Sequence, residues 1–180
     1  MAEYDDKGMD GAATGAAAGR SVAVFAVGGC RCALPAEAVE EVLLLPELAC
    51  PPGMPSVFEG VMNLEGLAVP VLRLDRLFGL PEGTPGLYSP LILLRGLVPR
   101  TALLVDEVRE VRRLEGARAV ASVVPGAVLA DCTVALIGEG EHAIHLLDPQ
   151  RLLLEGEQAR LTAFQAREQE RLAGWGASSS

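Results

Sequence analysis

An internal repeat constrains the fold of this chain more than any other feature of its sequence. When the sequence is shifted by 69 positions against itself, residues 33–42 (ALPAEAVEEV) align with residues 102–111 (ALLVDEVREV). Ala, Leu, Val, Glu and Val recur at equal offsets, and Leu45 falls on Leu114. The strand–glycine–strand pattern around the match repeats as well. The repeat indicates two related β subdomains of about 60 residues each.

The repeated units have the pattern of short β-strands. Two apolar runs within residues 22–34 flank Gly28-Gly29, which predicts a β-hairpin. Residues 35–42 begin with proline and carry early acids, as a short helix or turn does. Further strands are predicted at 133–138 and 142–147. Short strands at regular spacing favour small barrels or sandwiches over βαβ units, so the predicted fold is mainly β.

Composition shifts predict where the domain begins and ends. Residues 1–20 are small, polar and rich in Gly and Ala, and we expect a disordered tail there. The domain is predicted over 21–173, followed by a second disordered tail at 174–180. Within the domain, the expected parts are subdomain 1 at about 21–86, subdomain 2 at about 87–150 and a C-terminal helix at about 151–173.

The C-terminal helix has a recognisable start. Asp148 is suited to cap the helix, and Pro149 suits the first helical position. Leu161, Phe164 and Leu172 then lie roughly on one face. We therefore expect this helix to pack across the two subdomains.

Charge and composition exclude several classes of protein. The net charge is −9 and Lys7 is the single lysine, which argues against a nucleic-acid partner. The first twenty residues carry acids and lack the leucine-rich stretch of a secretory signal, and no run is apolar enough to span a membrane. The cytoplasm is therefore the expected location. The four cysteines should be reduced thiols there: Cys30, Cys32, Cys50 and Cys132.

We find no set of residues in the sequence that indicates catalysis, metal binding or a cofactor. His142 and His145 suggest a metal site, but on a strand this spacing places the two side chains on opposite faces. Cys30 and Cys32 lack a second close cysteine pair, so small core thiols are the favoured interpretation. Phosphate-binding glycine motifs are absent from the sequence. At 105–108 (VDEV), a turn-capping Asp106 is favoured over a binding role.

Residues 60–74 (GVMNLEGLAVPVLRL) form an unusually apolar hairpin pattern with an acid, Glu65, in its turn. Asn63 can hydrogen-bond to the turn backbone, and Gly66 can adopt a positive φ in a bulged turn. Pro70 cannot donate a ladder hydrogen bond, so its strand should be an edge or be bulged there. Apolar residues occupy both faces of the strands. One face must enter the core; the other is either covered by the second half or offered to a partner, and internal covering is favoured.

Three segments together resemble the CheW coupling family of bacterial chemosensory systems. They are AEAVEEV followed by a proline-rich loop, then GVMNLEGLAVPVLRL, and then the strand ending ALLVDEV. The resemblance spans roughly residues 20–170. It implies two small five-stranded, SH3-like β-barrels packed around a shared apolar seam. It also implies a non-enzymatic function, in which the protein links the regulatory domain of a CheA-type histidine kinase to the cytoplasmic tip of methyl-accepting receptors.

The resemblance also implies which residues make these contacts. The kinase-interface candidates are Glu41, Val42, Leu44, Gly60 and Asn63, and the receptor-groove candidates are Val39, Glu65 and Val108. Glu65 departs from the family pattern, which has arginine in this turn. That arginine could pair with the acid matching Glu41, whereas here two carboxylates would face each other. This departure suggests altered partner specificity in a divergent pathway.

The expected protein is monomeric when isolated, lies in the cytoplasm without inserting into the membrane, and is recruited to receptor arrays at the inner membrane. Two alternatives remain open. One is a scaffold with a single interface, which binds the kinase but not receptors. The other is a metal-dependent enzyme that uses His142 and His145, which the strand geometry disfavours.

Overall fold

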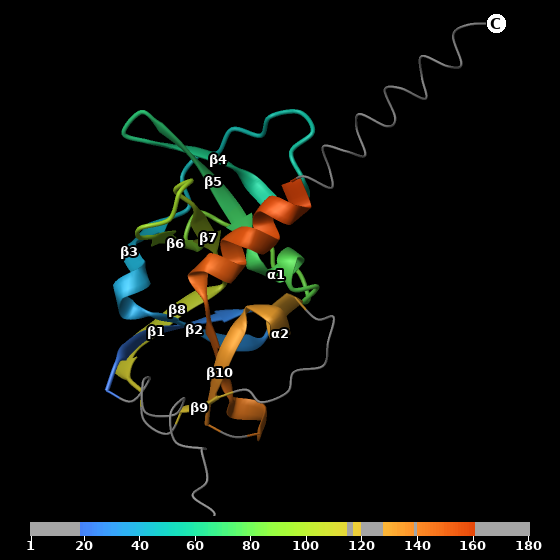
Figure 1. Cartoon of the computed structure of the whole chain (residues 1–180). Coiled ribbons are helices and arrows are strands. Elements are labelled where there is room, and N and C mark those ends of the chain that lie inside the picture. Colours follow the sequence, from blue (N-terminus) through green and yellow to red (C-terminus); the bar gives the residue numbers. More distant parts are fainter. Residues whose placement is uncertain (1–18, 115–116, 120–127, 139, 161–180) are drawn as a thin grey trace, which may run out of the picture.

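The computed structural model describes residues 19–114, 117–119, 128–138 and 140–160, and these residues form a mainly β structure of two stacked sheets (Figure 1). The first sheet has the strand order β8-β1-β2-β11-β10-β9. Its strands are β1 (Ser21–Val27), β2 (Cys30–Pro35), β8 (Glu107–Arg113), β9 (Ala117–Ala119), β10 (Thr133–Ile137) and β11 (Ile144–Leu147).

The second sheet has the strand order β3-β6-β7-β5-β4. Its strands are β3 (Val39–Leu44), β4 (Phe58–Leu64), β5 (Leu67–Arg73), β6 (Pro90–Leu94) and β7 (Ala102–Leu104). Beyond β3 the chain continues to Ala49, which forms an antiparallel bridge with Val61 of β4. This bridge joins the two ends of the strand order, so the second sheet curls into a small barrel.

The helical elements are short, apart from the helix at the C-terminal end of the described chain. They are η1 (Ala36–Ala38), α1 (Leu74–Leu77), α2 (Val128–Cys132) and η2 (Gly140–His142). The predicted helix or turn at 35–42 is therefore one 3₁₀ turn, and the residues after it belong to β3. No helix among the described residues is long and apolar enough to cross a membrane.

The strand order confirms the internal repeat. A shift of 69 residues places β1 on β6, β2 on β7 and β3 on β8. The order β8-β1-β2-β11 in the first sheet matches β3-β6-β7-β5 in the second. Each sheet contains one parallel pair at the equivalent place, β2 with β11 and β7 with β5.

The sequence predicts subdomain 1 at about 21–86 and subdomain 2 at about 87–150. The two sheets are not each built from one of these continuous segments. After β2 the chain crosses into the second sheet, and after β7 it crosses back to form β8. Residues 39–104 therefore supply the second sheet, while 21–35 and 107–147 supply the first. The first sheet also has six strands where five are expected. The two repeat units exchange strands: each sheet combines the first two strands of one unit with the remaining strands of the other.

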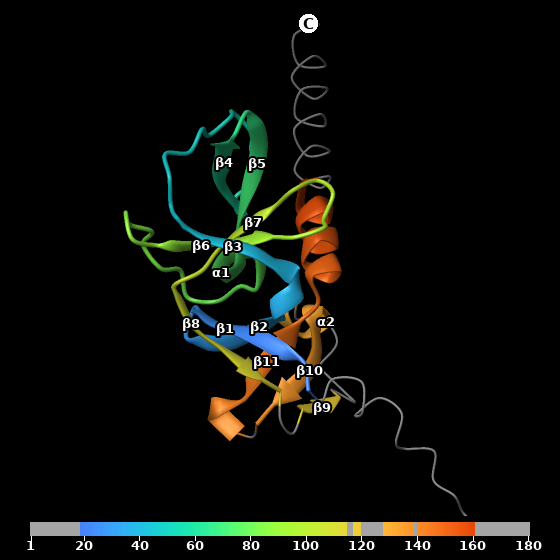
Figure 2. The ribbon, with the colours of Figure 1, turned by 90° about the vertical axis from the view of Figure 1, so that its left-hand side faces the viewer.

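Three apolar cores stabilise this arrangement. A central core lies between the sheets and takes residues from both, including Phe25, Leu34, Leu72 and Ile92, all at most 1% exposed. One smaller core lies on the other face of the first sheet, and another lies inside the barrel of the second. Figure 2, turned by 90° from Figure 1, shows β3 running across the junction between the sheets. The central core is the predicted apolar seam.

The C-terminal helix begins at residue 149 and is described as far as residue 160. Asp148 caps it as predicted, because its Oδ1 accepts a hydrogen bond of 2.9 Å from the backbone N–H of Gln150. Leu152 is fully buried in the central core. The helix lies against the second sheet (Figure 1). Leu161, Phe164, Leu172 and both expected tails, except Gly19 and Arg20, lie outside the described residues.

Candidate functional site

Strand β3 presents an apolar surface at the edge of the second sheet. It pairs with β6 on one side, and no strand of the described chain pairs with its other side. Val42 and Leu44 are 46% and 61% exposed, while Leu43 between them packs against the barrel core. Glu41 is also exposed. Side chains alternate across a strand, so Val42 and Leu44 lie on the face turned away from the core.

A tight turn extends this surface. The backbone N–H of Ser89 donates to the carbonyl of Gly86, and the N–H of Leu45 donates to the carbonyl of Ser89, each at 2.9 Å. These bonds hold the turn beside the end of β3. Leu87 and Tyr88, at the centre of the turn, are 81% and 84% exposed. We call Val42, Leu44, Leu87 and Tyr88 the β3 surface. Leu87 and Tyr88 were not predicted from the sequence, although two large apolar residues inside a Gly/Pro-rich linker are a usable signal.

The β4–β5 hairpin carries Asn63 and Glu65 in the predicted turn. Oδ1 of Asn63 accepts a hydrogen bond of 2.8 Å from the N–H of Gly66, as predicted. Leu64 pairs with Leu67, so the loop has two residues and no bulge. Glu65 and Gly66 have φ values of 51° and 85°, which suits a type I′ turn. Asn63 and the two turn residues lie at the exposed tip of the hairpin.

The two faces of this hairpin have different environments. Met62, Val69 and Val71 point into the barrel core and are at most 2% exposed. Val61 and Pro70 pair across the hairpin on the opposite face and are half-buried. Strand β7 pairs with β5 only from Val71 onward, which is why Pro70 costs the sheet no hydrogen bond.

Gly60 is buried, unlike the other kinase-interface candidates. A Cβ atom at this position would lie 2.8 Å from Cβ of Leu48 and 2.9 Å from the carbonyl oxygen of Ala49. The glycine lets the chain after β3 approach β4 closely enough to close the barrel. Gly60 therefore positions neighbouring residues and offers no side chain or free surface to a partner.

The receptor-groove candidates do not all come together. Val39 of β3 and Val108 of β8 are both half-buried and pack against the central core, one from each sheet. Glu65 lies at the tip of the β4–β5 hairpin, which is well separated from β8 in both Figure 1 and Figure 2. Val39 and Val108 therefore share a location at the seam, and Glu65 belongs to a different surface.

The comparison with protein families decides what kind of domain this is. The model of the CheW-like domain family matches residues 21–157, most of the described chain. The chain belongs to the CheW-like domain family.

The CheW-like fold is also found among solved structures. The crystal structure of the scaffolding protein TtCheW from Thermoanaerobacter tengcongensis is similar, with a TM-score of 0.63 and 22% sequence identity. The match covers 72% of this chain and 89% of that chain. At this identity the likeness concerns the fold, and it confirms the predicted pair of small SH3-like subdomains. A search of curated proteins finds no match.

The potentially reactive side chains of this CheW-like domain are dispersed. His142 lies in η2 and His145 in β11, so the two do not share a strand. Burial lowers the pKa of His145, whose Nδ1 lies 3.3 Å from Oγ1 of Thr133. Burial also raises the pKa of Cys32 and of Cys132 to about 12, which leaves both as unreactive thiols. The described residues contain no group of three or more potential metal ligands.

Asp106 caps a turn in the CheW-like domain. Its Oδ2 accepts a hydrogen bond of 2.8 Å from the N–H of Gly28, in the hairpin between β1 and β2. Gly28 and Gly29 both have positive φ in this turn, and the hairpin predicted around them is present. Asp106 follows β7 of the second sheet, so the bond ties one sheet to a turn of the other. The favoured structural interpretation of Asp106 is confirmed.

A buried ionic network that was not predicted from the sequence supports the hairpin of the CheW-like domain. Arg73 and Asp75 are 3% and 4% exposed, and Arg73 also donates to Glu59 at 3.2 Å. Arg73 donates a further bond of 2.8 Å to the carbonyl of Gly83. Arg73 ends β5 and Glu59 lies in β4, so the network joins the base of the hairpin to the linker before β6. The LRLD sequence contains the pair but does not show its burial.

Proposed function

We propose that this CheW-like domain is a non-enzymatic coupling protein. It links the regulatory domain of a CheA-type histidine kinase to the cytoplasmic tip of methyl-accepting chemoreceptors, and it acts in the cytoplasm at receptor arrays of the inner membrane. Family membership supports the scaffold role, and the dispersed reactive side chains give no support to a catalytic one. The assignment of partners is carried by the exposed β3 surface.

The kinase contact is assigned to β3. Val42 and Leu44 are large, exposed and apolar, and they project from a strand whose outer edge pairs with no other strand of the described residues. Exposed aliphatic side chains of this kind lose apolar surface to water-free contact when a partner covers them, whereas exposed charges contribute little. Glu41 lies on the same strand and supplies a charge beside these residues. Asn63 contributes by holding the neighbouring hairpin in its turn conformation.

The receptor contact is assigned to the seam around Val39 and Val108. Val39 is the first residue of β3 and Val108 the second of β8, and both are half-buried against the core that the two sheets share. An amphipathic receptor helix could bury its apolar face between these strands. Glu65, on a separate surface, is assigned to partner selection and not to the groove.

The test compares Val42→Asp with a matched control, Leu154→Asp. Leu154 lies on the C-terminal helix and is 53% exposed, close to the exposure of Val42. We expect Val42→Asp to weaken binding to the kinase regulatory domain by about tenfold or more. Leu154→Asp should bind as the natural chain does. Circular dichroism and thermal unfolding should show both variants folded.

Unchanged kinase affinity of a folded Val42→Asp variant would contradict the assignment of this surface. A parallel binding assay with the receptor tip separates the full coupling role from the alternative, a scaffold with a single interface. That alternative is favoured by Glu65, which stands where the family pattern has arginine. In that alternative the protein binds the kinase domain, Val42→Asp still weakens this binding, and binding to the receptor tip is undetectable.

A further inference from the structure

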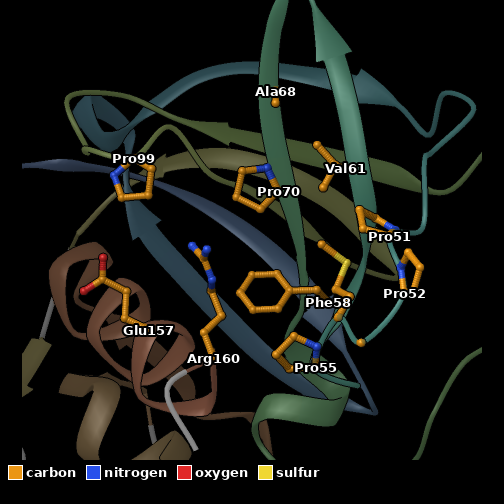
Figure 3. A pocket seen from close by; sticks show the side chains of 12 residues that line it. Pro51, Pro52, Pro55, Phe58, Val61, Ala68, Pro70, Pro99, Glu157 and Arg160 are labelled. Atoms are coloured by element: carbon orange, nitrogen blue, oxygen red, sulfur yellow. The ribbon is translucent and has the colours of Figure 1, made fainter. Parts of the chain in front are cut away.

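A large apolar cavity lies on the outer face of the β4–β5 hairpin (Figure 3). Its volume is about 770 Å³, within the range of cavities that bind small molecules. Ten of the twelve described residues that line it are uncharged, and five of these are prolines: Pro51, Pro52, Pro55, Pro70 and Pro99. Val61, Ala68 and Pro70 contribute the outer face of the hairpin, so the described chain leaves that face partly uncovered.

The proline-rich loop that forms one wall of the cavity is held by its own hydrogen bonds. The backbone N–H of Met54 donates to the carbonyl of Pro51 at 3.2 Å, and that of Phe58 donates to the carbonyl of Pro55 at 3.0 Å. The proline rings restrict the backbone further, because each fixes its own φ. The cavity is therefore preformed, and a ligand would not have to order this wall on binding.

The C-terminal helix forms a second wall and supplies the charged lining residues, Glu157 and Arg160. Figure 3 shows the guanidinium of Arg160 extending toward Pro70 and Phe58, while the carboxylate of Glu157 lies toward Pro99. Among the described residues, none forms an ion pair with Arg160. The apolar cavity thus contains one guanidinium group without a counter-charge.

The position of Arg160 determines which charge a ligand of this cavity should carry. An apolar ligand that fills the cavity removes water from the guanidinium, and a buried charge without a partner is costly. A carboxylate compensates this charge and can accept two parallel hydrogen bonds from the planar group. A doubly charged phosphate would keep one charge uncompensated, because Arg160 is the one cationic residue among the described lining, and a cationic ligand would meet a like charge there.

We propose that this cavity binds a small amphiphilic carboxylate, an apolar chain that ends in a single carboxylate group. The chain packs on Phe58, Met54 and the proline rings, where it loses contact with water, and the carboxylate pairs with Arg160. Helix and hairpin both line the cavity, so the bound ligand joins the C-terminal helix to the β4–β5 hairpin. The proposal is independent of the kinase and receptor contacts.

Isothermal titration of the full-length chain with decanoate, and with the neutral decanol, tests the proposal. We expect one decanoate to bind per chain, at least about tenfold more tightly than decanol. Arg160→Gln should remove this preference and leave the affinity for decanol unchanged. The matched control is Arg151→Gln, which makes the same change on the same helix at a side chain that is 53% exposed and does not line the cavity. It should keep the preference for decanoate.

Two further measurements locate the ligand. The chain contains four methionines, so ¹³C labelling of their methyl groups gives a simple NMR spectrum, in which Met54→Leu assigns the Met54 signal. Decanoate should shift this signal and leave that of Met62, in the barrel core, unchanged. Ala68→Trp places a large ring at an exposed position of the cavity lining, and it should weaken the binding of both ligands at least about tenfold while circular dichroism shows a folded chain.

Equal affinities for decanoate and decanol would overturn the assignment of a carboxylate, and so would a preference that survives Arg160→Gln. Binding that leaves the Met54 signal unchanged, or that survives Ala68→Trp, would place the ligand elsewhere and contradict the proposal. If neither ligand binds the full-length chain, the proposal is wrong, and this face is left to another part of the chain or to a protein partner.

Discussion

The guanidinium of Arg73 donates two hydrogen bonds to the carboxylate of Asp75, 3.0 Å from Nε to Oδ1 and 2.5 Å between NH2 and Oδ2, and both side chains are buried. The carboxylate also accepts bonds from the backbone N–H groups of Arg76 and Gly83, at 2.9 and 3.2 Å. No buried side-chain N or O atom of the described chain lacks a hydrogen-bond partner. The pair therefore joins the end of β5, α1 and the following linker into one unit.

Removing one charge of this pair should destabilise the domain strongly. We predict that Asp75→Asn lowers the free energy of unfolding by about 3–5 kcal/mol, because the buried Arg73 guanidinium loses its bidentate partner and keeps the part-exposed Glu59 at 3.2 Å as its counter-charge. The control is Glu107→Gln, which makes the same chemical change in an exposed pair with Arg109 at 3.2 Å. It should cost at most about 1 kcal/mol. Urea unfolding of both variants measures the difference; equal effects would contradict the prediction.

The same pair should make stability depend on pH in the acid range. Burial alone would raise the pKa of Asp75, but the hydrogen bond from Arg73 and those from the two backbone N–H groups outweigh it, and the pKa is lowered from 3.8. A carboxyl whose pKa is lower in the folded state stabilises the fold above its unfolded pKa. This contribution is lost as the pH falls through the folded value. Urea unfolding from pH 6 down to about pH 2 should show the natural chain losing more stability than Asp75→Asn. Parallel curves for the two proteins would contradict this.

Local features of the fold were predictable because they depend on neighbouring residues. Gly28-Gly29 and Asn63 with Gly66 specify their turns through backbone conformation and one short hydrogen bond, and the structure contains both hairpins. The cap at Asp148 is equally local. Strand exchange was not predictable, because the pairing of β2 with β11 joins residues far apart in the chain. The repeat indicated two equivalent units but not which sheet each strand enters.

The candidate site was predictable in part, because exposure and close backbone contacts depend on residues that are far apart in the chain. The edge position of β3 agrees with the exposure of Val42 and Leu44, yet the sequence alone does not show exposure. Gly60 looks like an ordinary strand glycine until the Ala49–Val61 bridge places another backbone against it. Arg73 and Asp75 look like surface charges, since burial of an ion pair depends on tertiary contacts.

Gly60 provides a test of barrel closure. We predict that Gly60→Ala destabilises the domain by about 1–3 kcal/mol, because the new methyl group must displace Leu48 or the Ala49 backbone. The matched control is Gly86→Ala, since a Cβ atom there meets nothing within 4 Å and the φ of Gly86 is not positive. Gly86→Ala should change stability by less than about 0.5 kcal/mol. Thermal unfolding of the two variants measures the difference in stability. If Gly60→Ala leaves the stability unchanged, the barrel can open at this position.

Glu65 has a structural and a functional role that two substitutions can separate. Its φ of 51° is costly for a residue with a long side chain, whereas Asn tolerates it and Asn-Gly is the preferred pair for this turn. We predict that Glu65→Asn raises the free energy of unfolding by about 0.5–1 kcal/mol. Glu65→Arg keeps the backbone cost, so its stability should stay within about 0.5 kcal/mol of the natural chain.

If Glu65 selects the partner, Glu65→Arg must change the affinity for the kinase domain or the receptor tip beyond the change caused by Glu65→Asn. Both substitutions remove the negative charge, and only arginine adds a positive one, so their difference isolates the charge reversal from the turn conformation. Binding assays at low and high salt provide the measurement, because an exposed charge effect weakens as salt increases. Equal affinities of both variants for both partners would remove Glu65 from the interface and leave its role structural.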